Sequence, residues 1–199
     1  FLSSKVLKPS NDKSFNFSRG YIDSYSSSCS VGDIPASDFN LTIYGGFSNQ
    51  TGITSSVSQD VHLAQAGNIN LNVNGEATNA VQSYNFDLSI GRSAIDTLGN
   101  NFRPTNFIVE YPIEVGVSFD LVVGDYESSG VYDLICSPIK QDLTITLNDC
   151  SGVKIREFSI ANAQLIDYST TAGIGDNMTA SLSYVKYLKT TGEIPALFS

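Results

Sequence analysis

The chain has 199 residues, of which 41% are hydrophobic and only 16% are charged. A chain of this length can bury about 70% of its unfolded surface, as one large domain or two small ones. With 20 acidic and 11 scattered basic residues, the formal net charge is −9. This charge excludes a nucleic-acid-binding face that neutralises phosphates, and it disfavours an anionic membrane surface as a partner.

The residue types that most catalytic and metal sites need are scarce. His62 is the single histidine, so a Ser-His-Asp or Cys-His mechanism would have to use it. The cysteines are Cys29, Cys136 and Cys150, an odd number that cannot form a closed disulfide framework. Two interpretations stay open: one disulfide between Cys136 and Cys150, or three free thiols. No stretch reaches the ~18 apolar residues of a membrane-spanning helix.

Residues 1–14 form a polar N-terminal arm that is either a free tail or a segment docking on another subunit. From Phe15 the sequence alternates, and Phe39, Leu41 and Ile43 follow at strict period two. Between them, residues 32–35 read Gly-Asp-Ile-Pro, a turn signal. This part of the chain therefore predicts strand, turn and strand.

Residues 45–81 are rich in Gly, Asn and Ser and predict a long inserted loop, with one strand over 69–73. Apolar residues then alternate at 84–90, where a strand is expected. Residues 91–99 break the alternation. Ser93 and Asp96 resemble a capping box and Gly99 a terminator, so one short helix is predicted there.

Further strands are predicted at 107–111, 113–123 and 143–147. The last two carry few charges, so at a sheet edge they would need a neighbouring chain to cover them. About ten short strands with almost no helical periodicity predict an all-β fold, a duplicated β-sandwich or barrel with one short helix and a long inserted loop. The expected organisation is an arm (1–14), a first β unit with the long loop (15–81) and a second β unit (82–199), packed as one compact body.

The duplication is inferred from a self-match without gaps between residues 20–33 and 163–176. Tyr25-Ser26 aligns with Tyr168-Ser169, and both copies end in Gly-Asp. Gly32 and Gly175 would supply a positive φ at a hairpin turn, and Asp33 and Asp176 would close it with an Asx hydrogen bond. We take these four residues as structural turns of the repeat.

Four stretches of the sequence resemble virion structural proteins of tailed bacteriophages, the tail-tube kind most of all. They are residues 22–35, residues 82–90, residues 110–117, and residues 163–169 continuing through 175–182. The resemblance implies a scaffold protein with no active-site residues, located in a virion that is assembled in the host cytoplasm. It also implies partners: further copies of the chain, other virion proteins, and genomic DNA that passes without specific binding.

Candidate groups for chemistry are few. Asp120, Asp125, Glu127 and Asp133 are the carboxylates considered for acid/base work, and they are interpreted as solvated loop charges. His62, near Asp60, is interpreted as a silent histidine. No phosphate-binding, dinucleotide or nucleophile-elbow motif occurs. We therefore expect no catalytic, metal-binding or cofactor-binding residues, and no enzyme.

The predicted function is a structural virion protein that self-assembles into rings or a tail tube and forms a conduit for DNA. An acidic inner wall would repel phosphate and let the genome pass. Two alternatives stay open: a capsid or head decoration protein, and a receptor-binding adhesin domain. The adhesin would use loop aromatics, for which the candidates are Tyr21, Tyr44, Tyr126 and Tyr132.

Overall fold

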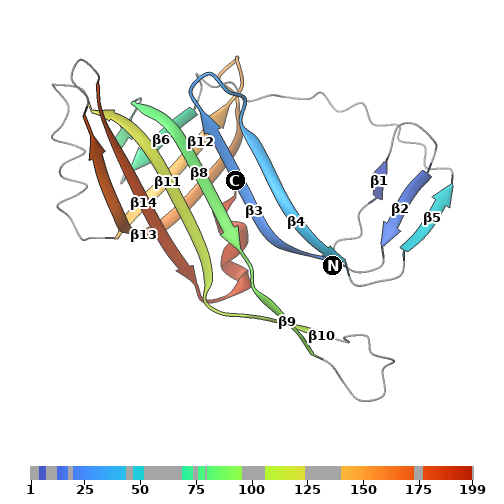
Figure 1. The fold of residues 1–199 in the computed structure, drawn as a ribbon. Helices are drawn as coiled ribbons and strands as arrows, with labels where there is room; N and C mark the ends of the chain where they lie inside the picture. Colours follow the sequence, from blue (N-terminus) through green and yellow to red (C-terminus); the bar gives the residue numbers. More distant parts are fainter. Residues whose placement is uncertain are drawn as a thin grey trace. The chain divides into compact units, whose positions relative to one another are not determined.

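The computed structural model describes residues 5–7, 13–17, 20–43, 47–51, 69–73, 76–78, 80–95, 106–123, 140–172 and 177–198. Within these ranges the chain is almost entirely β-strand, which confirms the all-β prediction (Figure 1). The strands are β1 (Lys5–Leu7), β2 (Lys13–Phe17), β3 (Gly20–Ser30), β4 (Ala36–Ile43), β5 (Phe47–Thr51), β6 (Ile69–Val73), β7 (Glu76–Thr78), β8 (Val81–Ser89), β9 (Arg92–Ile95), β10 (Asn106–Val109), β11 (Ile113–Val123), β12 (Gln141–Asn148), β13 (Lys154–Thr171) and β14 (Met178–Leu188). A short 3-10 helix, η2 (Thr191–Leu197), follows them.

The strands form one large sheet and two small ones. The large sheet has nine strands in the order β4-β3-β8-β11-β14-β13-β12-β6-β7. The small sheets have the orders β1-β2-β5 and β10-β9. The pairing is antiparallel for β8 with β11, β11 with β14, β14 with β13 and β13 with β12.

The chain divides into two compact units that are interleaved along the sequence. One holds residues 1–25, 39–61 and 90–110; the other holds residues 26–38, 62–89 and 111–199. Strands β3 and β4 contribute residues to both. The predicted boundary between residues 81 and 82 falls inside the second unit.

The core of the second unit is built by period-two alternation, as the sequence predicts. Tyr84, Phe86 and Leu88 are buried in β8, whereas the residues between them face the other side. The same holds for the central strand β11 and for β12. The buried members of these two strands are Ile113, Val115, Val117, Phe119, Leu121, Leu143, Ile145 and Leu147. Each such side chain contributes about 1.5–3 kcal/mol by leaving water.

A bulge in β13 curls the large sheet. The first part of β13 pairs with β12, and its second part, from Gln164 onward, pairs with β14. At the change of partner Asn162 has a φ of +58°, and its N–H donates to Asp142 Oδ1 at 2.7 Å. Asn tolerates this left-handed conformation better than most residues. The curled sheet forms a half-barrel (Figure 1).

Aromatic side chains fill the concave side of this half-barrel. The ring of Phe86 in β8 stacks on that of Phe158 in β13, with centroids 4.6 Å apart. Phe198, after η2, meets both rings edge-on at 5.9 Å. Phe119 stacks on Tyr184 at 5.5 Å, and the Tyr184 hydroxyl donates to the buried Gln141 Oε1 at 2.6 Å. The C-terminal segment is therefore part of the core.

The predicted helix at 91–99 is wrong, and the structure adds detail to the predicted loop and arm. Residues 92–95 form strand β9 instead of the start of a helix, because they pair with β10; the short helix of the described chain is η2. The long loop 45–81 contains β5 and β7 in addition to the expected strand. The arm is not a free tail throughout, since β1 pairs with β2.

The prediction for strands that need a neighbour is also corrected. Strand β11 lies between β8 and β14, and β12 lies between β13 and β6. Both have intramolecular partners on each side, so neither is at an edge. The terminal strands of the large sheet are β4 and β7.

Candidate functional site

The convex side of the half-barrel carries a polar surface, which we call the acidic face. It consists of the outward residues of four adjacent segments of the second unit: β8, β11, β14 and the second part of β13, from Gln164 onward (Figure 1). Its polar members are Ser83, Asn85, Asp87, Ser89, Glu114, Ser118, Asp120, Thr179, Ser181, Ser183, Gln164, Asp167, Ser169 and Thr171. Val185 and Tyr187 share the same side of β14.

The composition of the acidic face follows from the strand register. Asp120 lies opposite Ser83 on one side and Ser181 on the other, and Glu114 lies opposite Ser89 and Tyr187. The face holds four carboxylates, those of Asp87, Glu114, Asp120 and Asp167, and no Lys or Arg. Lys186 belongs to the other side of β14, because it lies opposite the buried Val115.

Hydrogen bonds join side chains to one another at the centre of the acidic face. The Asp120 carboxylate is half-buried and accepts from the hydroxyls of Ser83 and Ser181, both at 2.5 Å. Asp87 accepts from the amide of Asn85. These short side chains bond along the sheet instead of projecting from it. The exposed carboxylates of Asp87, Glu114 and Asp167 therefore stand on a wall of small polar groups.

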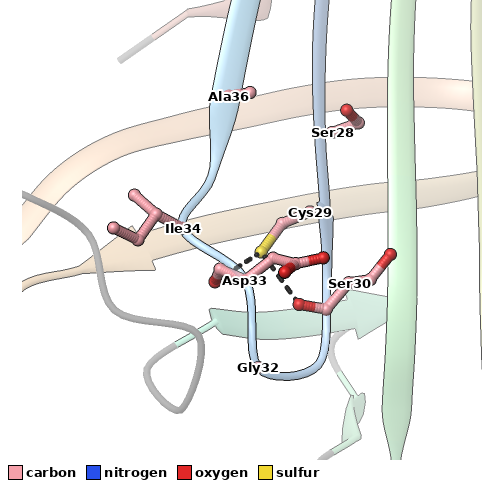
Figure 2. Close-up of a pocket in the computed structure, with 7 residues that line it drawn as sticks. All are labelled: Ser28, Cys29, Ser30, Gly32, Asp33, Ile34 and Ala36. Atoms are coloured by element: carbon pink, nitrogen blue, oxygen red, sulfur yellow. Dashed lines mark hydrogen bonds between the residues drawn. The ribbon is translucent and has the colours of Figure 1, made fainter.

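The predicted turn of the first repeat copy is described, and Figure 2 shows the pocket beside it. Gly32 has a φ of +92°, in the left-handed region that favours glycine. The Asp33 N–H donates to the Ser30 carbonyl at 3.0 Å. The pocket is lined by Ser28, Cys29, Ser30, Gly32, Asp33, Ile34 and Ala36. Gly175 and Asp176, the matching turn of the second copy, lie outside the described residues.

Cys29 is the chemically distinctive residue of this pocket. Its thiol is buried and lies 3.4 Å from the carbonyl oxygens of both Ser30 and Asp33 (Figure 2). Burial raises the pKa of the Cys29 thiol, and the negative charge of Asp33 raises it further. The protonated thiol is a poor nucleophile, so this pocket is not arranged for thiolate chemistry. Cys150 is an exposed free thiol, and Cys136 lies outside the described residues.

The structure does not gather the predicted candidate residues into one site. Of the four carboxylates considered for acid/base work, Asp120 is on the acidic face, in a strand and not in a loop. His62, Asp60, Asp125, Glu127 and Asp133 lie outside the described residues. Over the described ranges, no group of three or more His, Cys, Asp or Glu residues is placed to hold a metal ion.

Of the aromatic residues considered for glycan binding, the structure describes Tyr21, and its ring packs against other residues of the chain. The guanidinium carbon of Arg92 lies 4.7 Å from the centre of the Tyr21 ring, and the Phe107 ring is tilted against it at 5.2 Å. Arg92 is held by the Ile22 carbonyl at 2.8 Å and by Asp23 at 3.9 Å. Tyr21 therefore packs inside the first unit. Tyr44, Tyr126 and Tyr132 lie outside the described residues.

The acidic face was missed by reading the sequence for apolar alternation alone. Its signal is the other half of the same pattern: Ser83, Asn85, Asp87 and Ser89 alternate with apolar residues in the strand predicted at 84–90. What the sequence lacked was the register that places this row beside those of β11, β14 and β13.

Among the described residues, no helix is long and apolar enough to cross a membrane.

Comparisons with known proteins find similar chains among solved structures. No family model matches the sequence, and no curated protein matches it. Among solved structures, a chain in the cryo-EM structure of the anti-feeding prophage baseplate, six-fold symmetrised, is 12% identical, with a TM-score of 0.41. The match covers 61% of this chain and 87% of that chain. A likeness at this level assigns no function.

Proposed function

We propose that this chain is a structural protein of a phage-tail-like particle, in which copies associate into rings or a tube that forms a conduit for DNA. The observation that supports this best is the acidic face, on which β8, β11, β14 and the second part of β13 present mainly small polar groups and carboxylates, without a basic residue. The proposal includes no catalysis, metal or cofactor. The expected partners are further copies of the chain and other particle proteins.

The acidic face suits a surface along which a polyanion moves. Phosphates bind proteins mainly through Lys and Arg, so a wall without these residues gives DNA no place to stick. The carboxylates of Asp87, Glu114 and Asp167 repel phosphate and hold water against the wall. The Ser and Asn side chains are short, so most of the surface is smooth; the exposed Tyr187 ring lies near the end of β14.

The rigidity of the same sheet supports a structural role. The acidic face is backed by the aromatic core, and its central strand β11 is paired along its length on both sides. A wall in a tube must keep its shape while DNA passes. A face in which every strand is tied to two others meets that requirement better than a loop-built surface does.

The experiment is negative-stain electron microscopy of the concentrated full chain. Rings or tubes with a central channel are the expected result. Decoration of preformed shells without self-assembly would favour the head protein instead. A stable monomer that binds glycans would favour the adhesin, and either result would overturn the proposal.

A further inference from the structure

Among the strands that the structure describes, β4 is one of the two terminal strands of the large sheet, and its first half is exposed. It pairs with β3 on one side and ends the strand order on the other. All residues from Ala36 to Asn40 are exposed. Proteins usually protect such an edge with Lys, Pro or a very short strand. Strand β4 has eight residues, no Lys, Arg or Pro, and one charged side chain, that of Asp38.

The two sides of β4 differ in polarity. Phe39, Leu41 and Ile43 alternate on one side, and the Phe39 side chain is 65% exposed, although a large aromatic residue is normally covered. On the other side, Asn40 donates to Ser24 Oγ at 2.7 Å and Thr42 donates to Asp23. The polar side is therefore tied to β3, whereas the apolar side includes an uncovered ring.

From these observations we infer that β4 pairs with β4 of a second copy, antiparallel and centred on Asn40. In this register Phe39 lies opposite Leu41 of the other copy, and Asp38 lies opposite Thr42. The two apolar rows therefore meet, and the two Asp38 carboxylates stay apart. A register shifted by one residue would place the apolar row against the polar row, and a parallel in-register pair would stack Asp38 on Asp38.

The pair is a closed two-fold contact. Each copy uses the same edge, so the contact joins two chains and does not continue to a third. The inference therefore goes beyond the proposed ring or tube, which needs other surfaces. It also covers an exposed sheet edge of the free chains, because the exposed residues of β4, Phe39 among them, become buried in both copies.

Engineered disulfides test the register in the full chain with Cys136→Ser and Cys150→Ser as background. Residues directly opposite each other in an antiparallel pair have Cα atoms about 4.5–5.5 Å apart, within the range that a disulfide spans. Asn40→Cys should therefore give a cross-linked dimer on oxidation. Thr42→Cys, the matched control that also loses one bond to β3, should stay uncross-linked alone and cross-link when mixed with Asp38→Cys.

Sedimentation of the unmodified chain and of Phe39→Lys gives the second measurement. The unmodified chain should sediment as two copies, and Phe39→Lys should raise the dissociation constant at least about tenfold, since each pair loses two ring contacts and gains a repelling charge on each edge. Circular dichroism should show the fold of Phe39→Lys unchanged. A monomeric chain, or equal cross-linking of Thr42→Cys and Asn40→Cys alone, would overturn the inference. Rings that form without the Asn40→Cys cross-link would contradict the pairing of β4 and support the proposed function. Cross-linked pairs that form no rings would support the pairing of β4 and contradict the proposed function.

Discussion

The buried hydroxyl of Tyr184 links the stability of the protein to alkaline pH. Its side chain is 1% exposed, and burial raises the pKa of Tyr184 to about 12, from a usual value of 10. The folded state therefore holds the phenol proton more tightly than the unfolded state. The tighter proton binding therefore stabilises the folded state fully below pH 10. This stabilisation, up to about 2–3 kcal/mol in the free energy of unfolding, is lost as the pH rises from 10 to 12.

Tyr184→Phe should make the free energy of unfolding fall less steeply between pH 10 and 12. At neutral pH the variant should be less stable by about 1 kcal/mol, because Gln141 Oε1 loses a buried donor. Urea unfolding at pH 8, 10, 11 and 12 measures both effects. The remaining tyrosines titrate in both proteins, so parallel curves for the two would show that Tyr184 is not the group responsible.

At the Gly32 turn, the cost of a positive φ can be measured separately from the cost of a side-chain clash. An added Cβ at Gly32 meets nothing within 4 Å, so a substitution there costs only the strain of a positive φ. Gly32→Ala should lower the free energy of unfolding by about 1–2 kcal/mol. Gly32→Asn should cost less, because Asn adopts this conformation more readily. Equal losses from both variants in urea unfolding would mean that the side chain, and not φ, is responsible.

At the scale of elements, the C-terminal helix closes the core from one end. Leu197 is 2% exposed, and Glu193 holds the start of η2 by accepting from the N–H groups of Lys189 and Thr190 at 3.1 and 3.2 Å. Leu197→Ala should cost about 2–5 kcal/mol through the cavity that it leaves. Val153→Ala, at a side chain that is 60% exposed, is the control and should cost less than about 0.5 kcal/mol. Similar thermal midpoints for the two would show that η2 is not part of the core.

The strands could be predicted wherever one face is buried, and the helix could not. Alternation at 84–90 and 143–147 marks β8 and β12 because the half-barrel core selects every second residue. The capping signal at Ser93 misled, since its hydroxyl bonds to Glu110 and residues 92–95 pair with β10. The same kind of signal at Thr190 and Glu193 does begin a helix. Local signals of this kind are decided by long-range pairing, which a single sequence does not contain.

The candidate site was predictable in kind but not in place. The net charge and the resemblance predict an acidic wall, but only the register shows which residues share one acidic surface, on β8, β11, β14 and the second part of β13. Three of its carboxylates, those of Asp87, Glu114 and Asp167, are not among the carboxylates that the sequence singles out. They look like ordinary solvent-facing strand residues until the pairing of β11 with β8 and β14, and of β14 with β13, places them on one surface.

At the scale of the whole molecule, the carboxylates of the acidic face should determine whether the protein binds DNA. Asp87→Lys, Glu114→Lys and Asp167→Lys together change the formal net charge from −9 to −3, because each replacement adds two charges. Asp120 is left in place, since Ser83 and Ser181 bond to it. The triple variant should bind a short DNA duplex that the unmodified chain does not bind.

Salt dependence shows whether the new lysines are the contacts. Three phosphate contacts give a slope of about −2.7 for the logarithm of the binding constant against the logarithm of salt concentration. The matched variant Asp87→Asn, Glu114→Gln and Asp167→Asn removes the carboxylates without adding cations, and it should not bind DNA. Fluorescence anisotropy at several salt concentrations measures all three proteins. Binding by the unmodified chain, or a salt-independent affinity of the lysine variant, would show that repulsion at this face is not what keeps DNA from the protein.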